Sequence, residues 1–135
     1  MTFLVDANVL TEPTKPAPAP KVVEWLTLNE ARVVVDSIIL GELLIGILSL
    51  APSRKRTRLE RWFASLERTI ECLPWDAAVS RRWASLVVTM NKRGEVLPVL
   101  DSMMAATALA HNLTVATRNV RHFRNAGVNV IDPFE

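Results

Sequence analysis

Three acidic residues occupy places where a charged side chain needs a chemical explanation. Asp6 directly follows the apolar run FLV, Glu42 lies inside the apolar segment IILGELLIGILSLA (38–51), and Asp101 begins the segment DSMMAATALA. Removing a carboxylate from water is costly unless it gains a hydrogen-bond donor or a cation. One bound cation would compensate all three charges, provided that the fold brings them together.

The residue types in the chain favour a hard divalent cation for this purpose. There is one cysteine, Cys72, and the two histidines, His111 and His122, do not stand together as a pair in the sequence. A zinc site built on thiolates or imidazoles is therefore not indicated. Carboxylate oxygens suit Mg²⁺ or Mn²⁺. Such an ion neutralises the acids, holds a phosphate oxygen and lowers the pKa of a bound water until it can attack phosphorus. The three acids therefore predict phosphodiester hydrolysis.

Each of the three acids, taken alone, also has a simpler interpretation. Asp6 could close a strand through an Asx-turn. Glu42 could be exposed on a half-solvated helix. Asp101 could be an ordinary N-cap, where aspartate is favoured. Their occurrence together in one short chain favours a shared site.

The elements that must position these acids follow from the hydrophobic pattern. Short aliphatic runs alternate with helical patterns, which is typical of an α/β fold with a parallel sheet covered by helices on both faces. In such sheets ligands bind at the carboxyl ends of the strands, where the strand order reverses, so Asp6 is well placed. Strands are expected at 2–6, 32–36, 70–75, 114–118 and 128–132. Helices are expected at 21–26, at 38–51 with Ser37 as the N-cap, at 58–68, from Val79 to a C-cap at Gly94, and at 101–112.

Composition is that of one compact domain. The chain has 135 residues, of which 50% are hydrophobic and 22% charged, with a net charge of +2. A single cysteine, Cys72, fits a reducing cytoplasm, and we expect it to be buried in a strand. No secretory signal is apparent at the N-terminus, and the segment 38–51 is shorter than the roughly 20 residues needed to span a bilayer. We expect a cytoplasmic protein without a membrane partner.

Four stretches of the sequence resemble the successive motifs of PIN-domain proteins, in particular the VapC-like toxins of bacterial toxin–antitoxin pairs. They are FLVDANVLTEP, SIILGELLIG, LPVLDSMMAATALAHNLTVATRNVRHF and GVNVIDPFE. The resemblance implies a single PIN-like domain over 1–135, folded as a three-layer α/β/α sandwich with a five-stranded parallel sheet. It also implies a Mg²⁺- or Mn²⁺-dependent endoribonuclease, an RNA substrate and a cognate antitoxin protein. We expect a homodimer as well.

The same resemblance assigns roles to individual residues. Asp6, Glu42 and Asp101 match the first three acids of the family, which bind metal and carry catalysis. Asn8 and Thr11 match the polar positions that follow the first acid. These five residues form the expected centre of the site.

The fourth acidic position of the family is where this chain departs from the pattern. Thr117 matches the hydroxyl residue at the end of the fourth strand. The fourth acid falls near TRNVRHF, where the chain has Asn119 and His122 and no carboxylate. Ala7 also departs, since threonine is usual there. We predict that Asn119 lines the metal site and weakens a second cation position, because an amide oxygen can bind Mg²⁺ but carries no charge.

Basic residues offer candidate contacts to RNA. Arg118, Arg121 and Arg124 follow a strand end close to the acids and are expected to contact the RNA backbone. The run SRKRTR (53–58) could also contact phosphates, or could be a solvated helix start. His122 is more simply a surface histidine than a catalytic base.

Two other functions compete with the endoribonuclease. A catalytically weak PIN-like module would bind RNA or a protein without cutting, which the missing fourth acid favours. A haloacid-dehalogenase-like phosphatase also begins with an aspartate after the first strand, but it normally has a second aspartate two residues later, where this chain has Asn8. Retention of three acids favours the nuclease.

Overall fold

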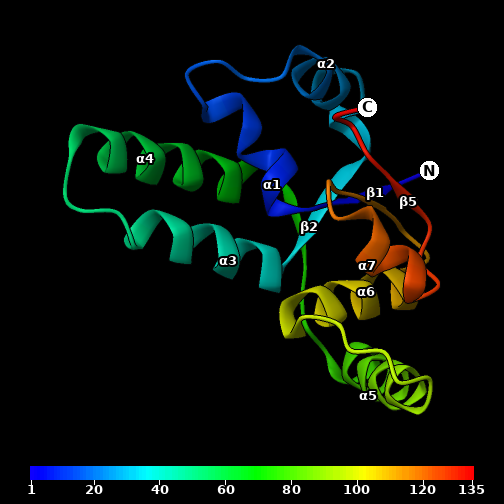
Figure 1. Cartoon of the computed structure of the whole chain (residues 1–135). Helices are drawn as coiled ribbons and strands as arrows, with labels where there is room; N and C mark the ends of the chain where they lie inside the picture. Colours follow the sequence, from blue (N-terminus) through cyan, green and yellow to red (C-terminus); the bar gives the residue numbers. More distant parts are fainter.

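A computed structural model describes all 135 residues and contains one parallel sheet with the strand order β3-β2-β1-β4-β5 (Figure 1). The prediction of a five-stranded parallel sheet is confirmed. Each predicted strand is present, although each is shorter than predicted. The strands are β1 (Phe3–Val5), β2 (Val33–Asp36), β3 (Glu71–Leu73), β4 (Thr114–Ala116) and β5 (Val130–Ile131).

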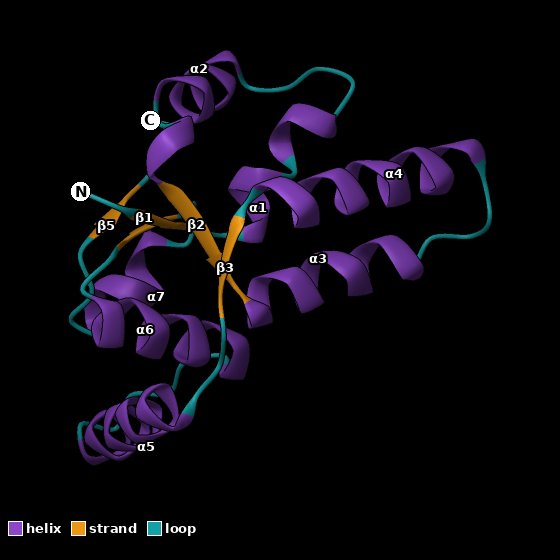
Figure 2. Ribbon diagram, turned by 180° about the vertical axis from the view of Figure 1, so that it is seen from behind, coloured by secondary structure: helices purple, strands orange, loops and turns teal.

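Helices cover both faces of the sheet, which confirms the three-layer α/β/α arrangement (Figures 1 and 2). Helices α1 and α2 lie on one side, and α6 and α7 on the other, with α5 packed against the outside of α6. The helical elements are α1 (Ala7–Leu10), the 3₁₀ turn η1 (Glu12–Thr14), α2 (Pro20–Leu28), the 3₁₀ turn η2 (Glu30–Arg32), α3 (Ser37–Leu48), α4 (Arg54–Thr69), α5 (Ala77–Lys92), α6 (Val99–His111) and α7 (Val120–Asn125).

The centre of the core lies at the middle strand β1 and its neighbour β4. Leu4 and Val5 of β1 and Val115 and Ala116 of β4 have no exposed surface. Continuous apolar runs of this kind are typical of parallel strands buried on both faces. Complete burial of one such aliphatic side chain contributes roughly 1.5–3 kcal/mol. These strands therefore form a rigid base for the residues that follow them.

Helices α3 and α4 run side by side as a hairpin that projects from the sheet (Figure 2). Ile39, Leu43 and Ile47 face the core at a spacing of four residues. Ile45 and Leu48, on the same helix, are 65% and 51% exposed. The hairpin thus presents apolar side chains to solvent. No helix of the chain is both long enough and apolar enough to cross a membrane.

Capping of α3 and the start of α6 differ from the sequence-based expectations. The Asp36 carboxylate accepts a hydrogen bond from the Ile39 N–H at 2.8 Å, so Asp36 caps α3 and the prediction of a Ser37 cap was wrong. Aspartate and serine are about equally good N-caps. Here α3 already begins at Ser37, so the last residue of β2, Asp36, takes the cap position. Helix α6 begins at Val99, so Asp101 lies within its first turn and is not its N-cap.

Three further expectations concern the end of α5, the short helices and Cys72. Arg93 is the C-cap of α5, so the prediction of Gly94 as the cap was off by one residue. Gly94 follows with φ +72°, and the Glu95 N–H donates to the Met90 carbonyl, so a glycine does terminate the helix. The short helices α1 and α7 were not predicted. Cys72 is exposed, because β3 is an edge strand, so its predicted burial was wrong.

Candidate active site

The strand order reverses between β1 and β4, and two polar residues follow these strands. Asp6 comes directly after β1, and Thr117 directly after β4. The Asp6 N–H donates to the Ala116 carbonyl at 2.9 Å, which joins the two strand ends. This point of reversal is where open parallel sheets bind ligands. Asp6 and Thr117 therefore stand at the strand ends where the sequence led us to expect a site.

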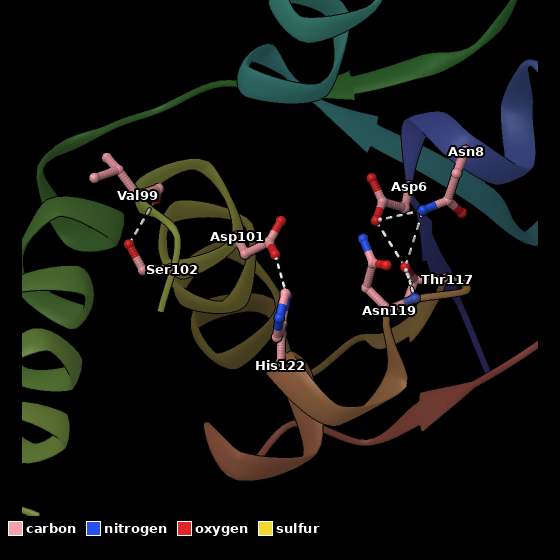
Figure 3. A network of polar contacts seen from close by, with 8 residues as sticks. All are labelled: Asp6, Asn8, Val99, Asp101, Ser102, Thr117, Asn119 and His122. Carbon is pink, nitrogen blue, oxygen red and sulfur yellow. Dashed lines mark hydrogen bonds and ion pairs between the residues drawn. The ribbon is translucent and has the colours of Figure 1, made fainter. Parts of the chain in front are cut away.

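The Asp6 carboxylate is buried, with 2% of the residue exposed, and is held by three donors. Oδ1 accepts from the Ala7 N–H at 2.7 Å. Oδ2 accepts from the Thr117 hydroxyl at 2.7 Å and from the Asn8 amide at 3.3 Å (Figure 3). Burial raises the pKa of Asp6, the hydrogen bonds from Thr117 and Ala7 lower it, and the nearby Asp101 charge raises it again. Direct hydrogen bonds thus account for an acid at the end of a buried strand.

Asn8, Thr117 and Asn119 form one network with Asp6. The Asn8 amide group also approaches the Thr117 hydroxyl at 3.4 Å, and the Asn8 carbonyl oxygen accepts from the Arg118 N–H at 3.2 Å. The Thr117 hydroxyl oxygen accepts from the Asn119 N–H at 3.0 Å. Figure 3 shows the Asn119 side chain between this network and Asp101. The polar residues selected from the sequence around Asp6 are thus brought together.

Asp101 makes a direct contact that the sequence did not predict. Its Oδ2 lies 2.6 Å from Nδ1 of His122, which joins the first turn of α6 to α7 (Figure 3). The Asp101 side chain is 15% exposed and that of His122 is 41% exposed. His122 thus lies at the surface, as expected, but its contact with Asp101 was not foreseen. Its place in the segment assigned to the fourth acid was the signal available in the sequence.

Glu42 lies on α3, near enough to the other acids for their charges to affect its pKa. It is half-buried and makes no hydrogen bond or ion pair. Burial raises its pKa first, and the charges of Asp6, Asp101 and Asp36 raise it further. The Glu42 carboxylate is therefore close to the other three, and no protein partner compensates it.

Asp36 is a fourth acid near Asp6, Glu42 and Asp101, and sequence reasoning treated it only as the end of a strand. It is 2% exposed, and although Oδ1 caps α3, Oδ2 has no hydrogen-bond partner. Burial raises the pKa of Asp36, and the Asp6 charge adds to the increase. The signal was present in RVVVD, where an acid ends an apolar run as Asp6 does in FLVD.

The donor set fits a hard divalent cation. No three histidine, cysteine, aspartate or glutamate side chains lie close enough together to bind one ion as they stand. Mg²⁺, however, commonly uses one or two protein carboxylates and keeps several waters. Three observations indicate a place where positive charge would be stabilised. No protein group compensates Glu42, Oδ2 of Asp36 has no hydrogen-bond partner, and the acids raise one another's pKa values. Asp6, Glu42 and Asp101 are the residues suited to hold it.

A groove of about 710 Å³ adjoins the acids. Asn8, Thr11 and Glu42 line one end of it, and the hairpin of α3 and α4 forms a wall. The Thr11 hydroxyl donates to the Ala7 carbonyl at 2.9 Å, so Thr11 stabilises α1 and does not contact Asp6. The apolar part of the lining includes Leu43, Ile47, Leu59 and Trp62, and the basic residues are Lys15, Lys55 and Arg58.

None of the three arginines selected as RNA contacts lines this groove. The Arg118 guanidinium lies 3.7 Å from the centre of the Phe134 ring. Arg121 and Arg124 line a separate hollow with Asp132 and Glu135. These arginines therefore do not project into the groove beside Glu42.

Comparison with known proteins identifies the class to which this fold and site belong. The PIN domain family matches residues 3–128. The chain therefore belongs to the PIN-domain family, as its motifs predicted.

Three similar proteins place the chain more narrowly within that family. It is 34% identical over 139 residues to Toxin FitB of Neisseria gonorrhoeae and 30% identical over 140 residues to VapC ribonuclease Y4jK of Sinorhizobium fredii, with 98% of each chain covered in both cases. The solved structure of FitAB bound to an IR36 DNA fragment superposes with a TM-score of 0.92 at 31% identity, covering 99% of this chain and 96% of the other. The resemblance to VapC-like toxins is thereby confirmed.

Proposed function

We propose that this protein is a divalent-metal-dependent endoribonuclease and the toxin of a toxin–antitoxin pair. The observation that carries the proposal is the group formed by Asp6, Glu42 and Asp101 at the reversal of strand order, where burial and mutual repulsion raise the pKa values of Asp6 and Glu42. The names of two relatives, a toxin and a VapC ribonuclease, support the same function.

Three carboxylates of this chain would hold Mg²⁺ or Mn²⁺, and the surrounding residues fix their positions. A bound ion of this kind supplies charge neutralisation at the phosphate and an acidified water. Thr117 and Asn8 hold the Asp6 carboxylate in one orientation. The first turn of α6 places Asp101 opposite, and the projecting α3 places Glu42 at the mouth of the groove. Attack of water on phosphorus leaves 5′-phosphate and 3′-hydroxyl ends.

The groove beside Glu42 suggests where single-stranded RNA lies. Lys55 and Arg58 supply positive charge at its margin, and Trp62 offers an aromatic surface for a base. Arg58 also lines a second, polar hollow with Arg54 and Arg61, so the positive charge continues along α4. Ser53 caps α4, so the run 53–58 is the solvated start of a helix, as one reading of the sequence expected. Lys55 and Arg58 on this helix start are also placed to bind phosphates in the groove.

Purified protein incubated with an RNA pool tests the proposed activity. We expect cleavage that requires Mg²⁺ or Mn²⁺ and yields 5′-phosphate ends, mapped by sequencing. Asp6→Asn should reduce the rate on the order of a hundredfold, since loss even of groups that support metal ligands costs 10–100-fold. Asp76→Asn is the matched control, because Asp76 is exposed and caps α5 away from the acids. Unchanged Mg²⁺-dependent cleavage by folded Asp6→Asn would refute the assignment.

The competing function is a module that binds RNA or a protein without cutting. The specific observation in its favour is the absence of a fourth carboxylate in the segment 117–123, where Asn119 and His122 stand. RNA binding without cleavage in any tested divalent metal would support this alternative against the nuclease.

We also propose a homodimer and a cognate antitoxin as partners. Exposed apolar side chains on α3 and at the start of α6 suit a second copy of the chain. They are Ile45 at 65%, Leu48 at 51%, Val99 at 65% and Leu100 at 40% exposure. Sedimentation should report a dimer at micromolar concentration, and Ile45→Glu should shift it to a monomer. Growth arrest on expression, relieved by the neighbouring small gene product, would support the antitoxin.

A further inference from the structure

We propose that His122 is a direct ligand of the divalent cation, and that its imidazole nitrogen gives this site a preference for Mn²⁺ over Mg²⁺. The inference rests on the proposed function, since it concerns the cation that Asp6, Glu42 and Asp101 would hold. It goes beyond that function because it assigns the ligand that stands in for the absent fourth carboxylate and predicts which metal the site selects.

The distance between His122 and Asp101 carries the proposal. Nδ1 of His122 and Oδ2 of Asp101 are 2.6 Å apart, and they form the only pair of histidine, cysteine, aspartate or glutamate side chains in direct contact in this chain. Neighbouring ligands on an octahedral ion, each about 2.1 Å from the metal, are about 3.0 Å apart. The two atoms therefore need to separate by only a few tenths of an ångström to share one ion.

The fold holds His122 in this position. Phe123, the next residue of α7, is fully buried and anchors the helix against the core. Asp101 in turn is fixed in the first turn of α6, which packs against α7. Neither side chain makes another hydrogen bond. Both groups are thus placed by buried structure and remain available to a ligand.

Donor chemistry gives the expected selectivity. Mg²⁺ prefers an all-oxygen environment. First-row transition-metal ions also accept an imidazole nitrogen, and Mn²⁺, although the weakest binder of that series, accepts one more readily than Mg²⁺ does. Asp6 and Glu42 supply oxygens, and His122 would add one nitrogen. The ratio of Mn²⁺ affinity to Mg²⁺ affinity should therefore be higher at this site than at a site with oxygen ligands alone.

Pulsed electron paramagnetic resonance of bound Mn²⁺ tests direct ligation without RNA. A coordinated imidazole couples its ¹⁴N nucleus to the manganese electrons, so wild-type protein should show nitrogen modulation. The chain supplies a matched control, because His111 is its only other histidine and lies exposed at the end of α6. His111→Ala should keep the modulation, and both His122→Ala and His122→Asn should lose it. Circular dichroism confirms that each variant is folded.

Metal affinities provide the second measurement. His122→Ala should weaken Mn²⁺ binding on the order of tenfold. His122→Asp restores an oxygen donor and should lower the ratio of Mn²⁺ to Mg²⁺ affinity, again on the order of tenfold. Bound Mn²⁺ without nitrogen modulation in the wild type, or modulation that survives His122→Ala, overturns the proposal. Loss of activity with unchanged Mn²⁺ and Mg²⁺ affinities would also overturn it, because His122 would then only position Asp101.

The design separates this inference from the proposed function. Nitrogen modulation and metal affinity are measured without RNA, whereas the nuclease assignment depends on cleavage by the wild type and its loss in Asp6→Asn. Metal-dependent cleavage without nitrogen coupling refutes ligation by His122 alone. Nitrogen coupling without cleavage refutes the nuclease and leaves the metal ligand established.

Discussion

The Thr117 hydroxyl donates to Oδ2 of Asp6 at 2.7 Å and joins residues 111 positions apart in the sequence. This bond crosses from the end of β4 to the end of β1, at the point where the strand order reverses. Burial raises the pKa of Asp6, and this hydrogen bond, together with that from the Ala7 N–H, opposes the increase. Thr117 therefore affects both the stability of the protein and the charge on its first acid.

Replacement of Thr117 by valine tests this relationship, since the two side chains have the same shape. Thr117→Val should lower the free energy of unfolding by about 1.5–3 kcal/mol, the usual contribution of a hydrogen bond to a charged group. It should also raise the pKa of Asp6 and weaken metal binding at neutral pH. Chemical denaturation and Mn²⁺ titration measure the two effects. Thr117→Ser retains the hydroxyl and should show much smaller changes in both.

Asp36 provides a test of how buried acids affect stability. Its raised pKa means that the folded state binds its proton more tightly than the unfolded state does. The stabilisation is therefore complete below the unfolded pKa near 4 and is lost as the pH rises through the raised folded pKa. Without metal, Asp36→Asn should flatten this decrease and raise the free energy of unfolding at pH 7.5 by on the order of 1 kcal/mol.

Thermal and chemical unfolding between pH 5 and 8, in the presence of a chelator, measure the effect of Asp36→Asn. Asparagine still caps a helix well, so the comparison isolates the charge. Asp76→Asn changes an exposed N-cap in the same way and should leave the pH dependence as it is. The pKa of Glu12 is lowered, mainly by the hydrogen bond from the Ala19 N–H, and acts with the opposite sign, but the stability that it contributes is lost only below the usual glutamate pKa of 4.5. Equal pH dependence in Asp36→Asn and the wild type would contradict the account.

Most of the sheet could be predicted because its strands are short apolar runs separated by helical patterns. FLVD and RVVVD place an acid at the end of a strand, and parallel strands bring such ends to one edge. The helices α1 and α7 were missed because four and six residues are too few to show a helical period. Their formation depends on tertiary contacts, such as the burial of Phe123.

The contents of the site were predictable only in part. Asp6 was predicted from its place at the end of a strand, whereas Asn8 and Thr117 were predicted from their match to the motifs of the family. The contact of His122 with Asp101 was not, because it depends on how α7 packs against α6 across 21 residues of sequence. Asp36 was overlooked because a helix cap explains the residue type without revealing that its second oxygen is buried.

Arg58 tests the proposed path of RNA along α4. It lines both the groove beside Glu42 and the neighbouring polar hollow, so Arg58→Ala should weaken binding of single-stranded RNA. The slope of log affinity against log salt should fall by about one unit as one phosphate contact is lost. Fluorescence anisotropy over a KCl series measures both quantities. Arg68→Ala is the control on the same helix, since Arg68 is exposed in its last turn and lines neither hollow. Indistinguishable salt slopes for the two variants would place the RNA elsewhere.

Asn119 tests how much negative charge the metal site requires. Its backbone N–H donates to the Thr117 hydroxyl oxygen, and its side chain, which does not cap α7, lies between Asp6 and Asp101 (Figure 3). Asn119→Asp adds a carboxylate at this place and should lower the Mg²⁺ or Mn²⁺ concentration that gives half-maximal cleavage. Asn119→Ala removes a neutral oxygen and should raise it. Each shift should be on the order of tenfold, the lower end of the effect of groups that support a metal site.

The matched control for Asn119→Asp is Asn125→Asp, which adds the same charge at the exposed end of the same helix. A general effect of net charge on the metal requirement would appear equally in both variants. We do not expect one, because screening leaves only nearby charges effective at ordinary ionic strength. An effect confined to Asn119→Asp would instead locate the added carboxylate at the cation. If Asn119→Asp and Asn119→Ala both titrate with metal like the wild type, Asn119 does not contribute to the site, and Asp6, Glu42 and Asp101 hold the cation without it.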